Sequence, residues 1–597
     1  MTNNIDLPLI GADLRDSETE NAGHLKDQRL RRLHIGAWLV VVILILVYGL
    51  PLRGLLRSQG PPMEEGFMLA FPEFVLRGLR PNRDFLHLYG PGSLWALAGT
   101  YKVFGVSLAT ERWFGVLQQV GMIAGVAGLA RYWGRTMTLT AGLVAIAFVI
   151  PPIGLTALAW NGAVALLTLG LLCGLEGRRR IDRSDAALKF ALFAGLLLGL
   201  ALTFRPDLII AATLGGVAAS WGMGKKFTKR MLAGAAIGLS PYILHLYLSG
   251  PMNVIRGMIL DPVFKLRGGR SLPIPPSWSQ FDSVLQRVGA EQLPRWPAPL
   301  SSPAQLALWF WVLIFAVFFI LAVSIWSIRR EPDRFNARAL LAIGVVSLGM
   351  LPQAIQRADS AHLSWVSCVP LVFLPIAVCE LSRLLHPKLG NRRVRTLGIT
   401  LGIASAVLLI FVVTPHFTAR IYADYTAQSF GYRRTAVPIT HNGRLFYYGR
   451  PEVQGAAESM LARIDSISKP GDRLFVGTSD LRKTPYSDAY LYYLLPWLTP
   501  ATYFVEMDPG MANAEDSRMP SDLASADIVV LSSIWKDWSE PNTSRNFGSL
   551  KSTKVLIRDF CLDESFGNGI YDLYTRRPKK EACPAGTLAP TPPPLEG

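Results

Sequence analysis

The chain has 597 residues, of which 50% are hydrophobic and 17% are charged, and its mean hydropathy is +0.30. This composition is typical of a membrane protein with many spans and some soluble mass attached. The formal net charge of +17 would also fit a nucleic-acid-binding protein. However, the basic residues lie in short clusters between apolar runs, so we exclude nucleic acid as a partner and expect membrane lipid instead.

The first 34 residues are polar, with acidic residues up to Glu20 and basic residues from Lys26 onward. This stretch is too long and too polar before its apolar core to be a cleaved signal peptide. We therefore expect residues 1–34 to form a disordered cytoplasmic tail.

Apolar runs of roughly spanning length follow one another through residues 35–414, which we expect to form an α-helical transmembrane domain. They lie near 35–52, 112–130, 137–153, 157–175, 187–204, 207–222, 231–248, 304–327, 339–355, 363–382 and 396–414. The stretch from Tyr89 to Phe104 is short, contains glycine and is interrupted by Lys102, so we expect it to lie in the interface or re-enter. The count is then about eleven transmembrane helices.

Strongly basic joints alternate with less basic ones between these runs. They contain Arg131 and Arg135; Arg178, Arg179, Arg180 and Arg183; Lys225, Lys226, Lys229 and Arg230; Arg329, Arg330, Arg334 and Arg338; and Arg383, Lys388, Arg392, Arg393 and Arg395. Because positive loops stay inside, we expect a cytoplasmic N-terminus and an extracytoplasmic C-terminus. Short inner loops with a large outer domain favour a bacterial cytoplasmic (inner) membrane enzyme that acts on the envelope.

The first outer loop, residues 53–111, carries the most informative group of polar residues. They are Glu64, Glu65, Arg83, Asp84, His87 and Tyr89. Acidic residues beside a membrane are costly unless they have a function or a partner, so the acidic pair indicates catalysis at the membrane surface. A structural role is the alternative, in which Glu64 or Glu65 caps a helix that starts at Gly66.

Other joints predicted to face the same side contain further candidate binding residues. They include Trp160-Asn161-Gly162, Arg205 and Asp207 around a proline, the long loop 249–303, and Arg357, Asp359 and His362. Each candidate also has a structural alternative to substrate binding. These alternatives are an Arg83–Asp84 ion pair that fixes the loop, a tight turn at Arg205–Asp207, ordinary interfacial positions for His87 and Tyr89, and a plain hydrophilic loop at 356–362. Asp359 and His362 supply too few ligands for a metal site.

Residues 415–585 have the composition of a globular extracytoplasmic α/β domain. Strands are predicted at Arg473–Gly477 and Asp527–Ser532, and helices at Ser459–Ile467 and Ser487–Leu495. No glycine-rich phosphate loop follows either strand, which excludes a nucleotide-binding domain. Cys561 and Cys583 are either a disulfide or two free thiols. The proline-rich residues 586–597 are predicted to be an unstructured tail.

Several motifs occur in an order that resembles the GT-C glycosyltransferases. They are MEEGF at Met63–Phe67, RPNRDFLHLYGPGSLW, VFGVSLATER and the glycine-rich GLLLGLALTFRPD. Across residues 35–414, the chain is similar to the bacterial integral-membrane enzymes that include the ArnT/PMT-like and RgtA/B/C/D-like groups. Glu64 stands where that family commonly has Asp, and Glu65 is a second candidate.

The resemblance implies transfer of a sugar from a polyprenyl-phosphate donor to an envelope glycan, lipid or protein outside the membrane. It implies a single inverting displacement with the first-loop carboxylate as general base. Arginines hold a leaving phosphate well, which makes Arg83, Arg205 and Arg357 candidates and makes a metal ion or other cofactor dispensable. The rival hypotheses are a transporter or flippase of lipid-linked sugars and a non-catalytic scaffold for envelope assembly.

Overall fold

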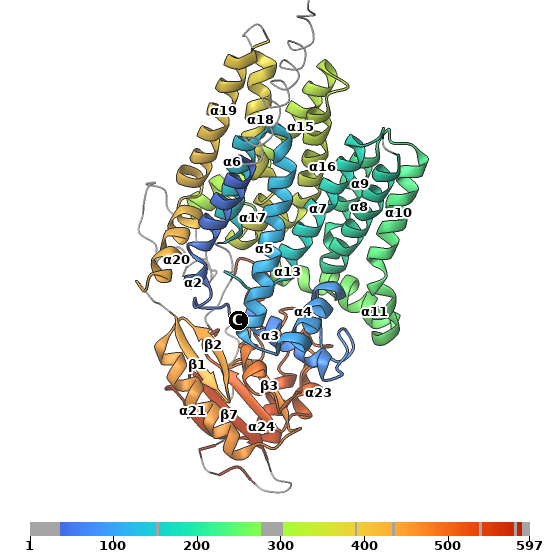
Figure 1. Ribbon diagram of the computed structural model, residues 1–597. Helices are drawn as coiled ribbons and strands as arrows, with labels where there is room; N and C mark the ends of the chain where they lie inside the picture. The colour runs from blue at the N-terminus through green and yellow to red at the C-terminus, as the bar shows by residue number, and fades with distance from the viewer. Residues whose placement is uncertain are drawn as a thin grey trace, which may run out of the picture.

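The computed structural model describes residues 36–150, 154–182, 184–275, 302–387, 391–432, 436–536, 540–577, 582–584 and 586–587. A helical bundle makes up most of the molecule, and a sheet domain formed by the C-terminal part of the chain lies at one end of it (Figure 1). The expected tail 1–34, residues 276–301 of the long loop and the end of the proline-rich tail lie outside the described residues.

Eight helices in the described part are long and apolar enough to cross a membrane. Their bounds are Gly36–Leu55 (ending in α2, Leu52–Leu55), Leu108–Trp133 (α5, Leu108–Ala130, and η1, Arg131–Trp133), Ala159–Arg179 (α7), Ser184–Phe204 (α8), Lys225–Ser249 (α10, Lys225–Leu239, and α11, Pro241–Ser249), Ala304–Arg330 (within α15, Ser302–Arg330), Phe335–Gln356 (α16) and Arg392–Val413 (α19, Asn391–Leu408, and η5, Leu409–Val413). A ninth results if α17 (Ser360–Ser367) and α18 (Pro370–Leu385), bent by 44°, are one span.

The two remaining predicted runs form shorter apolar helices, Arg135–Val149 (α6) and Pro206–Ser220 (η2, Pro206–Leu208, and α9, Ile209–Ser220). Every predicted run is therefore helical, but the helices long enough to span number eight or nine instead of about eleven. The stretch after Tyr89 forms α4 (Pro91–Phe104), which is not among these spans.

The glycine-rich motif in α8 allows very close packing against α10. A Cβ atom built on Gly195 would stand 1.8 Å from the carbonyl oxygen of Met231, and one on Gly234 would stand 2.0 Å from that of Leu192. Gly199 and Gly238 repeat the contact one turn further along. Small residues four positions apart let helix backbones approach each other in a membrane, where apolar side chains alone give little driving force.

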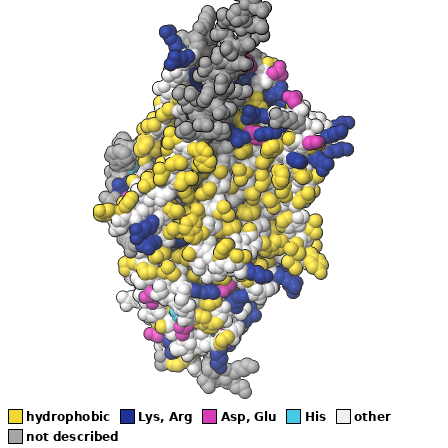
Figure 2. Space-filling model, viewed as in Figure 1, with side chains coloured by type: hydrophobic (Ala, Val, Ile, Leu, Met, Phe, Trp, Pro, Cys, Tyr) yellow, Lys and Arg dark blue, Asp and Glu magenta, His cyan; other side chains and the backbone are white. Residues whose placement is uncertain are grey.

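Hydrophobic side chains cover the middle of the molecule, and Lys and Arg gather above and below this belt (Figure 2). Large apolar residues of the spans are exposed there, including Trp38, Leu117, Phe193, Ile243 and Phe315. Such an apolar surface would be unfavourable in water, and it belongs to helices that are long and apolar enough to cross a membrane.

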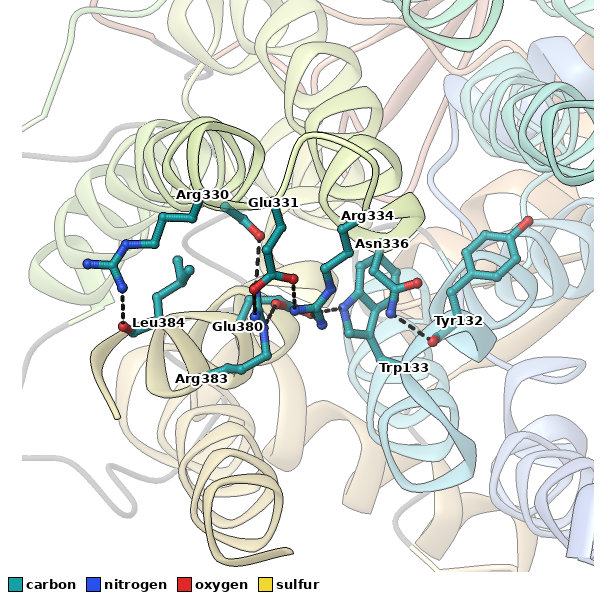
Figure 3. A network of polar contacts seen from close by, with 10 residues as sticks. Tyr132, Trp133, Arg330, Glu331, Arg334, Asn336, Glu380, Arg383 and Leu384 are labelled. Carbon is teal, nitrogen blue, oxygen red and sulfur yellow. Dashed lines mark hydrogen bonds and ion pairs between the residues drawn. The ribbon is translucent and has the colours of Figure 1, made fainter. Parts of the chain in front are cut away.

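A polar network joins α15, α16, α18 and η1 at the end of the bundle away from the sheet domain (Figures 1 and 3). The buried carboxylate of Glu380 accepts hydrogen bonds from Trp133 Nε1 at 2.7 Å, Arg334 Nη2 at 2.9 Å and Arg383 Nε at 3.0 Å. Arg383 also pairs with Glu331. The basic residues at this end thus neutralise a buried acid as well as marking one side of the bundle.

Short elements cover the other end of the bundle. They are α3 (Glu64–Leu76), α12 (Pro251–Ile255), η3 (Arg256–Leu260), η4 (Pro262–Leu266), α13 (Arg267–Arg270), η6 (His416–Arg420) and α20 (Ile421–Ser429). The segment between α3 and α4 contacts the end of α8 closely, because a Cβ atom on Gly90 would stand 2.0 Å from the carbonyl oxygen of Thr203. The Tyr-Gly-Pro-Gly part of the loop is therefore held beside the turn that contains Arg205.

The sheet domain has five strands in the order β4-β3-β5-β7-β6. Their bounds are Arg473–Thr478 (β3), Thr499–Pro500 (β4), Ile528–Ser532 (β5), Phe560–Phe566 (β6) and Tyr571–Arg576 (β7). β3 pairs in parallel with β4 and β5, whereas β7 pairs antiparallel with β5 and β6. The buried runs of β3 and β5 confirm the two strands that were predicted from short apolar stretches between turn residues.

Helices and a hairpin complete this domain. The helices are α21 (Pro451–Ile467), α22 (Tyr490–Leu494), α23 (Met519–Ala524), η7 (Thr543–Arg545) and α24 (Lys551–Asp559). β1 (Val437–His441) and β2 (Arg444–Tyr448) are joined through Asn442 and Gly443, both at positive φ, as a tight hairpin turn requires. Both predicted helices are present, and Cys561 and Cys583 form a disulfide with Cα atoms 5.5 Å apart.

Candidate active site

Every residue of the Met63–Phe67 motif makes a distinct contact at the start of α3. Met63 N–H donates to the Tyr486 hydroxyl at 3.4 Å, and Phe67 stacks on Phe71. A Cβ atom on Gly66 would stand 2.3 Å from the backbone nitrogen of Tyr490, so only glycine lets α3 lie this close to the sheet domain. The two carboxylates between these residues point to different surroundings.

Both carboxylate oxygens of Glu65 belong to a buried ion pair. Its carboxylate accepts hydrogen bonds from Arg112 Nε at 2.7 Å and Nη2 at 2.9 Å, with the two side chains 1% and 2% exposed. Arg112 also donates to the carbonyl oxygens of Leu55 and Ser58, which ties α5 to the end of the first span. Glu65 therefore joins three segments and has no face open to a substrate.

Glu64 has a different environment, because it is partly exposed at the first turn of α3 and accepts a hydrogen bond from the Tyr486 hydroxyl. Burial raises the pKa of Glu64, while the hydrogen bond from Tyr486 and the charges of Arg270 and Arg357 lower it. A carboxylate with a raised pKa and an accessible oxygen has the properties of a general base.

Arg205 lies between two aromatic rings, with its guanidinium carbon 5.0 Å from the ring centre of Tyr89 and 4.9 Å from that of Trp160. Its Nε and Nη2 donate to the two carboxylate oxygens of Asp207 at 2.9 and 2.7 Å. Among the described residues, Nη1 has no hydrogen-bond partner. Arg205 is thus fixed in position with part of its donor set available.

Burial raises the pKa of Tyr89, and the charges of Glu506 and Glu64 raise it further, while Arg205 and Arg270 lower it. The Tyr89 hydroxyl is therefore within electrostatic reach of the candidate base and of two arginines. This residue connects the segment between α3 and α4 to the turn after α8.

Arg357 forms a clamp between the membrane helices and the sheet domain. Its Nε donates to Asp359 Oδ2 at 2.6 Å, its Nη1 donates to the Arg270 carbonyl oxygen at 2.7 Å, and both terminal nitrogens bind the carboxylate of Glu540. Asp359 caps α17 by accepting from His362 N–H at 2.8 Å. Burial alone would raise the pKa of Asp359, but the charges of His362 and Arg357 and the hydrogen bonds from His362 together hold it well below its usual range.

An aromatic chain connects this clamp to Arg205. The ring of His362 lies 5.1 Å from that of Trp365, and Trp365 lies 5.9 Å from Trp160, on which Arg205 stacks. The predicted residues Tyr89, Arg205 and His362 are therefore brought together on one continuous wall, although they come from distant parts of the chain.

Three further residues that were not predicted from the sequence form a charged group, and two of them, Arg270 and Glu506, interact electrostatically with Glu64. Arg270, at the end of α13, pairs with Asp508 at 3.6 Å, and its charge acts on Glu64 and Glu506. Burial raises the pKa of Glu506 and of Asp508, and their mutual repulsion raises that of Glu506 further. The only sequence signal for this group was the pair Glu506 and Asp508, separated by one residue within an apolar stretch.

Of the other predicted residues, Arg83 and Asp84 lie in a local turn, and His87 packs edge-on against Tyr89 with ring centres 5.8 Å apart. Arg83 is 52% exposed and is 3.9 Å from Asp84, whose carboxylate accepts from the Arg80 N–H in a tight turn. Asp84 thus fixes this loop through the backbone of Arg80, while Arg83 lies at the limit of ion-pair distance. His87 is fully buried against Phe71, and burial lowers its pKa to about 3, so its ring is neutral at physiological pH.

The arrangement combines a partly exposed carboxylate with positioned guanidinium groups at the border between the apolar belt and the sheet domain. Such a site can remove a proton from a hydroxyl and can stabilise negative charge on a leaving group. Within the described residues, no three His, Cys, Asp or Glu side chains are placed to hold a metal ion.

No protein-family model matches the chain, and no similar curated protein was found. Solved structures with a similar course include ArnT from Cupriavidus metallidurans bound to undecaprenyl phosphate, with 15% identity, a TM-score of 0.49 and coverage of 90% of this chain and 97% of that one. The archaeal oligosaccharyltransferase AglB from Archaeoglobus fulgidus, in complex with an inhibitory peptide and a dolichol-phosphate, has 11% identity, a TM-score of 0.44 and coverage of 91% and 75%. The arabinosyltransferase EmbB from Mycobacterium smegmatis has 13% identity, a TM-score of 0.31 and coverage of 66% and 40%.

Proposed function

We propose that this protein is a GT-C-type membrane glycosyltransferase that moves a sugar from a polyprenyl-phosphate donor to an acceptor hydroxyl of the envelope. The acceptor is an envelope glycan, lipid or protein, and the reaction occurs at the outer face of the bacterial inner membrane. Residues 35–414 form the membrane domain and residues 415–585 the extracytoplasmic domain, with the N-terminus in the cytoplasm. The observation that carries the proposal is the accessible carboxylate of Glu64 beside Arg270 and the Arg205–Tyr89 pair.

In the proposed reaction, Glu64 takes the proton from the acceptor hydroxyl as its oxygen attacks the anomeric carbon of the sugar. The bond between that carbon and the phosphate oxygen breaks, and its electron pair leaves with polyprenyl phosphate. One displacement inverts the anomeric configuration. A weak nucleophile gains from a base within hydrogen-bond reach, and the contribution is typically on the order of 100- to 10,000-fold.

Glu64 is favoured over Glu65 because the two carboxylates differ in what they already bind. Glu65 shares both oxygens with a buried guanidinium, and protonating it would leave Arg112 without its counter-charge. Glu64 accepts from the neutral Tyr486 hydroxyl and from its own backbone N–H, and it forms no ion pair among the described residues, so it can take up and release a proton at lower cost.

The leaving phosphate requires a positively charged group that is held in position and still has N–H donors available. Arg205 supports this role because Tyr89 and Trp160 hold its plane while Nη1 keeps its donors, and Arg270 adds charge beside Glu64. Arg357 is engaged with Asp359 and Glu540, and its proposed part is to fix this wall and attach the sheet domain. Asp207 and His362 position the neighbouring groups.

The test is a transfer assay with purified protein in detergent, using a polyprenyl-phosphate sugar extracted from the native membrane and an envelope extract as acceptor. The expected result is release of polyprenyl phosphate in equal amount to sugar transferred. A flippase or scaffold has no such reaction in micelles, where there is no second leaflet. Absence of transfer from every donor fraction, by protein that remains folded, would contradict the proposed function.

A further inference from the structure

The sheet domain extends one tyrosine directly to the candidate base. Tyr486 lies between β3 and α22, is 1% exposed, and donates its hydroxyl proton to Glu64 Oε2, which is 422 residues away along the chain. Its hydroxyl oxygen also faces the Met63 N–H at 3.4 Å. With the backbone N–H on one side of the oxygen, the hydroxyl proton is directed to the carboxylate on the other.

We propose that Tyr486 is a positioning residue for catalysis, which orients the Glu64 carboxylate, so that the site is complete only when the C-terminal domain is docked. This inference rests on the proposed function of Glu64 and extends it to a residue outside the membrane domain.

Packing holds the Tyr486 ring in this orientation. The ring lies 4.3 Å from that of Trp535, and Trp535 Nε1 donates to the buried Asp488 at 3.2 Å. The series of contacts from Asp488 through Trp535 and Tyr486 to Glu64 therefore consists of side chains that are each held by a neighbour. A hydrogen bond from a fixed donor stabilises the carboxylate and selects which of its oxygens remains available.

The domain interface around Tyr486 supports the same conclusion. Arg444 binds both oxygens of Glu73, in α3, at 2.7 and 2.8 Å, and Gly66 lies against the backbone of Tyr490. The helix that begins with Glu64 is thus held by the sheet domain at its start and near its end. Undocking would release the base as well as its tyrosine.

The sign of the expected effect follows from the hydrogen bond. Tyr486 stabilises the charged form of Glu64 and lowers its pKa against the effect of burial. A general base works when deprotonated, so activity falls as the pH drops through this pKa. Removing the hydroxyl raises the pKa and moves the acidic limb of the pH–rate profile to higher pH.

The experiment compares wild type, Tyr486→Phe and Tyr571→Phe as full-length purified proteins. Tyr571 is a matched control because it is buried in the same domain and its hydroxyl bonds to Tyr490, at 2.9 Å, and to Asp488, which both belong to that domain. For Tyr486→Phe we expect the acidic limb of kcat to move up by about one to two pH units, with KM for the donor unchanged. Tyr571→Phe should keep the wild-type profile.

Two results separate this inference from the proposed function. If wild type transfers sugar and Tyr486→Phe keeps the same limb, or loses the same factor at every pH, the positioning role is wrong and the glycosyltransferase stands. If wild type shows no transfer from any donor, the proposed function fails and the inference fails with it. Thermal unfolding of each variant identifies a loss of activity that comes from misfolding.

Discussion

Replacing Glu65 by Gln is expected to destabilise the fold strongly, because it leaves a buried guanidinium without its counter-charge. Glu65 and Arg112 are 1% and 2% exposed, and two short hydrogen bonds join them. Removing one partner of such a pair typically costs about 3–5 kcal/mol. Glutamine keeps the size of the side chain and one acceptor oxygen, so the loss reflects the charge.

The assay is the free energy of unfolding in detergent, measured for Glu65→Gln, Arg112→Met and the double variant. The double variant should lose less stability than the two single changes added together, because it removes both charges at once. Glu64→Gln, measured alongside, should change stability by less than about 1 kcal/mol, since glutamine can still accept from Tyr486. Wild-type stability in Glu65→Gln together with abolished transfer would refute the reasoning and give Glu65 the catalytic role.

Three further predictions concern the phosphate site, the domain interface and the metal requirement. Arg205→Lys keeps the charge but loses the planar guanidinium, so KM for the donor should rise by about 10-fold or more. The exposed control Arg83→Lys should keep wild-type donor kinetics. An unchanged KM in Arg205→Lys would exclude Arg205 as a phosphate ligand. Gly66→Ala should lower the unfolding free energy by about 1–3 kcal/mol, because the added methyl group meets the Tyr490 backbone. Gly99→Ala is the control and should not lower it, because a methyl group there would have nothing within 4 Å. Equal stability of the two variants would contradict the close contact at Gly66. Transfer should survive excess EDTA, because arginines supply the positive charge at the leaving phosphate, and activity that is lost in EDTA and restored by Mg²⁺ or Mn²⁺ would overturn this.

The sequence predicted the architecture well where apolar length alone decides it. Each apolar run became a helix, but Arg135–Val149 and Pro206–Ser220 are shorter than the helices that are long enough to cross a membrane. Hydropathy does not show where a helix stops inside a run that stays apolar. The bend between Ser367 and Pro370 was likewise not predicted, although proline at the start of α18 is its local cause.

The candidate site was only partly predictable, since half of it comes from contacts between distant segments. The first-loop motif identified the Glu64–Glu65 pair, but only the positions of Arg112 and Tyr486 separate a buried ion pair from an accessible carboxylate. Arg357 was chosen as a phosphate ligand from its position in an outer joint. Its partner Glu540 lies 183 residues away, where no local pattern indicates the pairing.

The most direct measurement is the turnover of purified Glu64→Gln with the native polyprenyl-phosphate sugar, compared with wild type and with Glu515→Gln, whose exposed carboxylate lies in the sheet domain. The account predicts a loss on the order of 100- to 10,000-fold in kcat for Glu64→Gln, with donor binding and unfolding free energy close to wild type. It also predicts that the acidic limb of the pH–rate profile disappears in this variant, and that Glu515→Gln behaves as wild type. Near-normal transfer by a folded Glu64→Gln protein would contradict the assignment of Glu64 as the general base.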